Sequence, residues 1–287
     1  MLGHCDLSWK SAISPPLPPR AIVDPLAGGY RRIPVMQIGA DIFCDTKIIS
    51  SEIANISGNQ AMAIENCNAD IESFVDHSDS AVFMAIVTTS PPAKTIGLLF
   101  KLFSPWTALR FIKDRAGVSN TSSLAKVSRT ESRMIVQQYI QDINQRLNSS
   151  PYLFGESPTI ADFSAYHLIW FKNKFDESGF ETVQSKLTDW FERMRKLGHG
   201  DRTEIAKSDV FTEARDNIPR DIPASMTKDA LIGTTVSIKP NDYAKDPVTG
   251  KLVGLSDSRW ILARESNQFG VVHVHFPRNG FELLAKL

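Results

Sequence analysis

Apolar and polar positions follow three different patterns along the 287 residues. Short apolar runs separated by turn residues predict strands and a helix in the first part of the chain. The apolar spacing then changes to three and four residues, which predicts long amphipathic helices. Short β-rich runs return near the end. The patterns therefore predict a partial α/β segment at 1–60, an all-helical segment at 68–218 and a β-rich segment at 225–287.

The most informative stretch is residues 26–53. A Gly-Gly turn and Pro34 lead into an apolar run at 35–38, and a second run follows at 42–44 after a Gly-Ala-Asp interruption. This order predicts a short antiparallel hairpin followed by an amphipathic helix.

Four residues at this hairpin are candidates for ligand binding: Ile33, Pro34, Asp45 and Thr46. Free N–H groups and the dipole at the start of the following helix favour a carboxylate, while Asp45 offers a counter-charge for an ammonium group. Such a corner suits the zwitterionic end of an amino acid. A cis Ile33–Pro34 bond would turn the N–H and C=O of Ile33 outward, toward an extended peptide. The alternative is that Asp45 is only a helix cap.

These residues resemble the second half of the thioredoxin-like domain of cytosolic glutathione transferases. Tyr30-Arg31-Arg32-Ile33-Pro34, the hairpin and Cys44-Asp45-Thr46 carry the resemblance. It implies that glutathione is the co-substrate. It also implies that Ile33, ahead of a cis Pro34, binds the cysteinyl amide and that Asp45 and Thr46 bind the γ-glutamyl end.

Residues 155–162 carry a second resemblance, to the start of a buried helix in the all-helical domain of that family. Thr159 is predicted to cap this helix, and the side chain of Asp162 is predicted to accept from the Thr159 backbone N–H. We assign both to stability and not to the active site. The runs at 242–253 and 272–281 resemble a β-rich C-terminal extension of some bacterial and fungal glutathione transferase-like proteins.

The predicted fold is thus an incomplete thioredoxin-like α/β domain, an all-helical transferase-type domain and a small β-rich domain, forming a barrel or curled sheet. Helices are predicted at 71–86, 96–113 with a break at Pro105, 128–147, 163–171, 183–197 and 206–216. Strands are predicted at 7–14, 35–38, 42–44, 234–239, 251–255, 260–264, 270–276 and 280–284.

The family domain begins with a strand and a helix that precede a strand matching residues 7–14, and their junction carries the catalytic Ser, Tyr or Cys. Only about six residues stand there in this chain, so the catalytic residue stays unassigned. Loss of that interior strand would leave unpaired backbone groups, each costing about 1 to 3 kcal/mol if buried. We expect a misplaced start codon; a degenerate paralogue or a replacement for the strand are the alternatives. Cys5 and Cys44 could replace the nucleophile, but neither shows a paired base.

Composition excludes several classes of protein. Lys plus Arg equals Asp plus Glu at 32 each, which gives no argument for a nucleic-acid or membrane partner. Three scattered cysteines and the absence of a secretory signal favour the cytoplasm. His273 and His275 share one face of a strand as half of a metal site, but without a third ligand a structural role is favoured and no metal is predicted. A lone His167 on an apolar helix is interpreted as a core residue.

The function predicted by resemblance is a glutathione transferase. It would use glutathione on a small electrophilic apolar substrate, as a homodimer and as a tailoring enzyme of secondary metabolism. The alternative is a catalytically inactive binding or scaffolding protein of the same fold. The missing catalytic segment favours the alternative, whereas Pro34 and the Asp45-Thr46 pair favour the enzyme.

Overall fold

The computed structural model describes residues 1–122, 127–175 and 185–285. Two compact units are present in the chain. The helical unit comprises Met1–Ser8, Ile53–Arg110 and Ala125–Asp201, and the sheet unit comprises Trp9–Glu52, Phe111–Leu124 and Arg202–Leu287. These units do not follow the three predicted segments, because the hairpin and the C-terminal strands share one unit. The division of the chain into three domains stays a prediction.

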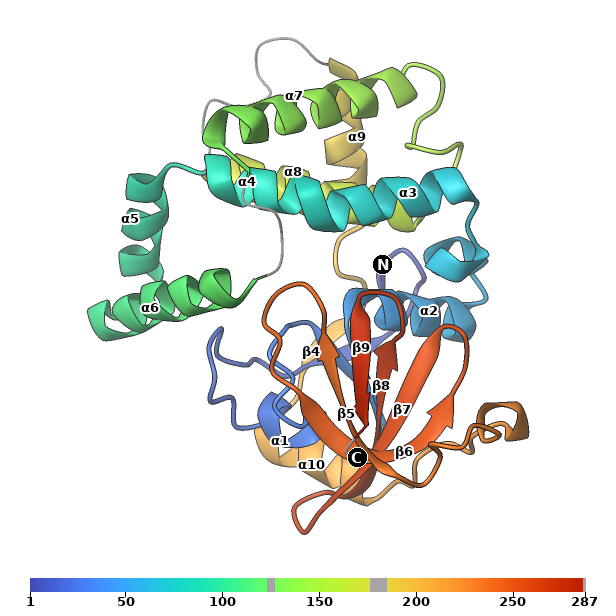
Figure 1. Cartoon of the computed structure of the whole chain (residues 1–287). Coiled ribbons are helices and arrows are strands. Elements are labelled where there is room, and N and C mark those ends of the chain that lie inside the picture. Colours follow the sequence, from blue (N-terminus) through green and yellow to red (C-terminus); the bar gives the residue numbers. More distant parts are fainter. Residues whose placement is uncertain (123–126, 176–184, 286–287) are drawn as a thin grey trace. The chain divides into compact units, whose positions relative to one another are not determined.

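Seven strands of the sheet unit form one mixed sheet in the order β2-β3-β8-β7-β6-β5-β9. The C-terminal strands of this sheet are the orange and red arrows of Figure 1. Its strands are β2 (Val35–Ile38), β3 (Asp41–Cys44), β5 (Thr235–Pro240), β6 (Val248–Leu255), β7 (Arg259–Ser266), β8 (Gly270–Pro277) and β9 (Phe281–Ala285). All neighbours are antiparallel except β3 and β8, which run parallel. The predicted hairpin and all five predicted C-terminal strands are confirmed.

The parallel pairing of β3 with β8 joins the hairpin to the C-terminal strands. Ile42 lies opposite Val274, and both side chains are fully buried. They belong to an apolar core that also includes residues of α1 (Val23–Ala27) and α10 (Lys207–Arg215). The hairpin therefore completes its core with residues from the β-rich end of the chain.

The predicted strand at 7–14 is corrected by the structure. Its strand, β1 (Trp9–Ser11), is shorter and pairs in parallel with β4 (Arg202–Glu204), outside the seven-stranded sheet. The chain cannot extend this ladder far, because the prolines from Pro15 onward lack a backbone donor. A strand does form within residues 7–14, but it lies outside the sheet that contains β2, unlike the strand of the family domain that it was expected to match.

The helices confirm the predicted breaks. They are α2 (Thr46–Ser57), which spans both units, α3 (Ala69–His77), α4 (Phe83–Thr89), α5 (Pro92–Leu102), α6 (Pro105–Thr121), which also spans both, α7 (Arg129–Arg146), α8 (Ile160–Phe175) and α9 (Ser185–Lys196). Pro105 begins a helix, as a residue without an N–H is suited to do. Positions 183 and 184 of a predicted helix lie outside the described residues. Within the described ranges no single helix is long and apolar enough to cross a bilayer, although the bent pair 69–89 and 92–102 meets that test together.

The predicted reciprocal cap at the start of α8 is confirmed. Thr159 donates its backbone N–H to Asp162 at 3.0 Å, and the Thr159 hydroxyl accepts from the N–H of Ala161 at 3.3 Å. The buried Asp162 carboxylate also accepts from the backbone N–H of Leu153 at 3.0 Å and from the indole N–H of Trp190 at 2.9 Å. This carboxylate ties three segments of the helical unit together, which supports its assignment to stability.

Candidate functional site

The open end of the β2–β3 hairpin brings the four predicted site residues together. Val35, the first residue of β2, pairs with Cys44, the last residue of β3. Pro34 and Asp45, the next residues outward on the two strands, are therefore neighbours. Ile33 is 54% exposed, and Pro34 and Thr46 are also exposed. The Ile33–Pro34 peptide bond is cis, as predicted. We call this end of the hairpin, with the start of α2, the hairpin corner.

Asp45 is both a helix cap and the charged group of the hairpin corner. Its backbone adopts a left-handed φ of 89°, and one carboxylate oxygen accepts from the N–H of Lys47 at 3.1 Å. The other oxygen lies 3.4 Å from the Tyr30 hydroxyl, which donates to it. Burial raises the pKa of the Asp45 carboxyl, although the Lys47 N–H and the charge of Arg32 oppose this shift. Asp45 therefore caps α2, as the alternative interpretation expected, and its carboxylate also lies at the hairpin corner.

Arg32 is a residue of this corner that the sequence reasoning missed. Its terminal nitrogen NH1 lies 3.8 Å from a carboxylate oxygen of Asp45. Its other terminal nitrogen, NH2, donates to the Tyr243 carbonyl at 2.6 Å and to the Asp242 carboxylate. The guanidinium carbon also lies 4.0 Å from the centre of the Tyr243 ring. Arg32 was quoted only as part of the family-like motif, and no local pattern links it to the loop between β5 and β6.

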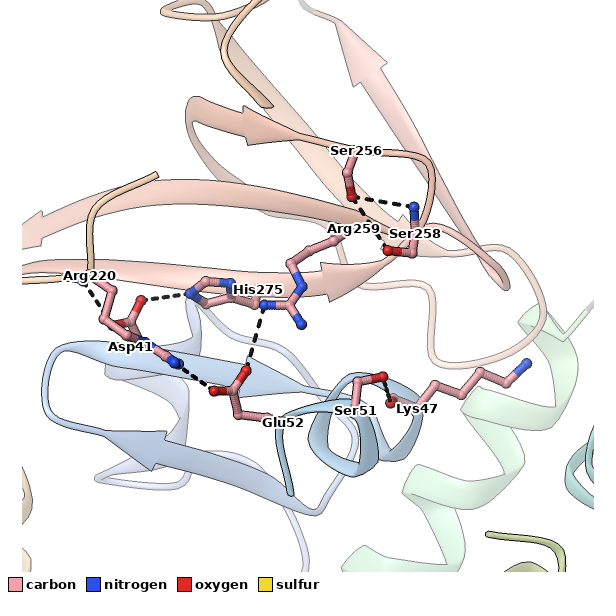
Figure 2. A network of polar contacts seen from close by, with 9 residues as sticks. All are labelled: Asp41, Lys47, Ser51, Glu52, Arg220, Ser256, Ser258, Arg259 and His275. Carbon is pink, nitrogen blue, oxygen red and sulfur yellow. Dashed lines mark hydrogen bonds and ion pairs between the residues drawn. The ribbon is translucent and has the colours of Figure 1, made fainter. Parts of the chain in front are cut away.

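A second polar cluster lies at the other end of β3, which begins at Asp41, and Figure 2 shows its members. We call it the carboxylate cluster, and it consists of Asp41, Glu52, Arg220, Arg259 and His275. Arg220 bonds Asp41 through its backbone N–H at 3.0 Å and its Nε at 3.2 Å, and bonds Glu52 at 2.6 Å. A guanidinium nitrogen of Arg259 lies 3.7 Å from the other Glu52 oxygen. Two buried carboxylates thus face two guanidinium groups, so the cluster balances its charge when His275 is neutral.

His275 forms a buried pair with Asp41. Its Nε2 lies 2.7 Å from a carboxylate oxygen of Asp41, and its ring stacks on Phe43. Burial lowers the pKa of His275, and the hydrogen bond to the Asp41 carboxylate opposes this shift. In the part of the chain that the structure describes, no group of three metal-ligating side chains is found. The structural interpretation of His275 agrees with these contacts.

Of the two nominated cysteines, Cys44 lies in a setting that does not activate a thiol. Cys44 is fully buried, and burial raises the pKa of its thiol well above the ordinary value. A buried neutral thiol is a poor nucleophile. Cys5 lies half-buried in the helical unit. The hydroxyl of Tyr30 is also buried, and burial together with the charge of Asp45 raises its pKa well above the ordinary value.

Two comparisons with known proteins describe the fold. The family model described as "Glutathione S-transferase, C-terminal domain" matches residues 120–198. A solved structure described as a GST-like protein from Pseudomonas syringae has a TM-score of 0.75 and 26% sequence identity, over 99% of this chain and 93% of that chain. No curated protein matches the chain significantly. The chain therefore has a GST-like fold, in which residues 120–198 match the helical C-terminal domain and a mixed sheet is present.

Proposed function

We propose that this protein binds glutathione at the hairpin corner and uses it as a co-substrate. The observation that carries the proposal is the meeting of Ile33, Pro34, Asp45 and Thr46 at one end of the hairpin, beside the start of α2. The helix start favours the γ-glutamyl carboxylate, and Asp45 provides a charge for its ammonium group. Ile33 is 54% exposed, and its backbone N–H and C=O would pair with the cysteinyl amide.

The proposed reaction is attack by the glutathione thiolate on a small, apolar, electrophilic molecule. A bond forms between the sulfur and an electrophilic carbon, and a leaving group departs or a double bond is moved. Such a step requires a lowered thiol pKa, which a hydroxyl or a positive dipole can supply. The described residues of the corner do not assign that group, because the buried Tyr30 hydroxyl already donates to Asp45 and Cys44 is fully buried. We place the protein in the cytoplasm, as a homodimer and as a tailoring enzyme of secondary metabolism.

The second candidate function is a non-catalytic binding or scaffolding protein of the same fold. The same two buried groups favour it, since neither is in a position to activate a thiol. The two functions differ in turnover and not in glutathione binding. A conjugation assay with an apolar chloronitroarene therefore separates them once binding has been measured.

Glutathione binding by calorimetry tests the proposal. Asp45→Asn should weaken binding about tenfold or more, because a charge-assisted hydrogen bond to the ammonium group is worth about 1.5 to 3 kcal/mol. Asparagine keeps the ability to cap α2, so the fold should be retained. Asp257→Asn is the matched control, since that side chain is fully exposed and should leave binding unchanged. Equal affinity of wild type and Asp45→Asn would remove Asp45 from the site.

A further inference from the structure

The corner already holds an acidic side chain from the C-terminal part of the chain. Asp242 and Tyr243 lie in the loop between β5 and β6, at residues 241–247, which we call the acidic loop. Asp242 accepts from Arg32, and the Tyr243 ring covers the guanidinium at 4.0 Å. A second contact, in which Arg31 Nε lies 4.0 Å from Asp246, holds the other end of the loop. The acidic loop therefore lies against the two arginines that precede Ile33.

The charges in this corner are complementary to those of a zwitterionic amino-acid end, because a carboxylate and a guanidinium lie side by side. Asp45 and the Arg32 guanidinium lie 3.8 Å apart, a spacing that suits the ammonium and carboxylate of one amino-acid end. Two carboxylates, Asp45 and Asp242, lie beside the Arg32 guanidinium. A ligand carboxylate, however, finds the NH2 group of Arg32 occupied by Asp242 and the Tyr243 carbonyl.

The remaining donors of Arg32 are not satisfied by the acidic loop. Its Nε is buried and makes no hydrogen bond. Its NH1 lies 3.8 Å from Asp45, beyond a normal hydrogen bond. A guanidinium normally receives a carboxylate on two parallel N–H groups. Arg32 NH2 donates to Oδ1 of Asp242, an oxygen that also accepts from the backbone N–H of Tyr243 at 2.8 Å. The Asp242 side chain is 30% exposed, so water can replace Arg32 as its partner.

We propose that Arg32 is the receptor for a carboxylate of glutathione and that Asp242 occupies this place in the free protein. The acidic loop is then an intramolecular competitor that glutathione displaces on binding. The proposal rests on glutathione binding at the hairpin corner, and it assigns to the C-terminal strands a role in setting affinity. Displacement breaks the Arg32–Asp242 contact and forms the bidentate Arg32–carboxylate contact, with no covalent change.

A double-mutant cycle with glutathione calorimetry tests this assignment. Asp242→Asn should tighten binding about fivefold, because the amide competes less well than a carboxylate for Arg32. Arg32→Gln should weaken binding about tenfold. In the Arg32→Gln background, Asp242→Asn should have no effect on affinity, since there is no guanidinium left to free. Asp257→Asn serves as the control for charge removal at an exposed site.

The ligand and the loop provide two further readouts. Glutathione with both carboxylates esterified should bind wild type and Asp242→Asn equally. Hydrogen exchange on wild type should show faster exchange in residues 241–247 when glutathione is added, and this measurement decides the matter if Asp242→Asn fails to fold. Slower or unchanged exchange would overturn the proposal.

The outcomes separate the inference from the proposed function. If wild type and Asp242→Asn bind glutathione equally well, the inference fails and the binding site stands. A weaker Asp242→Asn would also overturn it, because Asp242 would then be a partner of the ligand ammonium. If neither protein, nor the double mutant, binds glutathione, the proposed function fails and the inference fails with it.

Discussion

His275 shows how burial and a charged partner compete at one residue. Burial favours the neutral ring, whereas the 2.7 Å contact with Asp41 favours the charged one. Arg259 and Arg220 add to the effect of burial, and the pKa of His275 is lowered. Burial alone would raise the pKa of Asp41, but hydrogen bonds from His275 and the Arg220 backbone outweigh it, so that pKa is lowered too. Both shifts make the folded protein less stable in acid.

The stability of the protein should therefore fall as the pH is lowered from 7.5 to 5. The unfolded chain takes up a proton at His275 near pH 6.5, whereas the folded protein resists it, and each such group changes the free energy of unfolding by at most about 1.4 kcal/mol per pH unit. The contribution of Asp41 is lost only below about pH 4, as the pH falls through its lowered pKa. Urea unfolding of wild type and His275→Gln at both pH values measures the difference.

His275→Gln should lose less stability between pH 7.5 and 5 than wild type does. His199→Gln, a change at an exposed histidine, should behave as wild type does. An identical loss in wild type and His275→Gln would mean that His275 does not titrate in this range.

The structure also corrects the sequence interpretation of His167. Its side chain is exposed, so it is not a core residue.

At the scale of the elements, α1 ends where a strand of the C-terminal part passes closely. Gly28 follows the last residue of α1 with a left-handed φ of 70°, and its N–H bonds the Asp24 carbonyl. A Cβ at Gly28 would lie 2.6 Å from a methyl carbon of Val248 and 2.8 Å from Nε of Arg264. Gly29 has a similar φ of 85° but no atom within 4 Å of its Cβ position. The neighbouring glycines thus separate a backbone effect from a packing effect.

Gly28→Ala should destabilise the protein more than Gly29→Ala does. Both changes carry a left-handed backbone cost of about 1 to 2 kcal/mol. Gly28→Ala adds about 1 to 3 kcal/mol for overpacking against Val248, which cannot move as freely as the long Arg264 side chain. Urea unfolding of the two variants measures the difference in the free energy of unfolding. Equal losses would show that α1 does not pack tightly on β6.

At the scale of the whole molecule, contacts between the early and the late parts of the chain hold the sheet unit together. Arg220, in the segment between α10 and β5, bonds Asp41 of β3 and Glu52 of α2. Glu52 also faces Arg259 of β7. The hairpin corner therefore depends on residues that lie far beyond it in the sequence.

Arg220→Ala should lower the free energy of unfolding by about 3 kcal/mol, because it leaves two buried carboxylates with fewer partners. This is the lower end of the range for a broken buried pair, since the Arg220 side chain is itself 50% exposed. Arg202→Ala is the matched control: Arg202 pairs with the exposed Glu204 at 3.5 Å and should contribute less than about 1 kcal/mol. Circular dichroism in urea measures both, and equal small losses would contradict the role of the carboxylate cluster.

The sequence by itself determined the features that depend on near neighbours. Turn residues and alternation place the β2–β3 hairpin and the five C-terminal strands, Pro105 begins a new helix, and the Thr159–Asp162 spacing predicts a cap that is confirmed. Each follows from local backbone chemistry. The four candidate site residues belong to this group, because they adjoin a hairpin whose register the pattern sets.

Only the tertiary structure decided which distant segments meet. Residues 32 and 242 are separated by 210 positions and residues 41 and 275 by 234, so no local period contains these pairs. The parallel pairing of β3 with β8 was missed for the same reason, since alternation says which face of a strand is buried and not which strand lies beside it. Strand β1 pairs with β4 because the backbone N–H and C=O groups of a strand need partners, and the fold places β4 beside it.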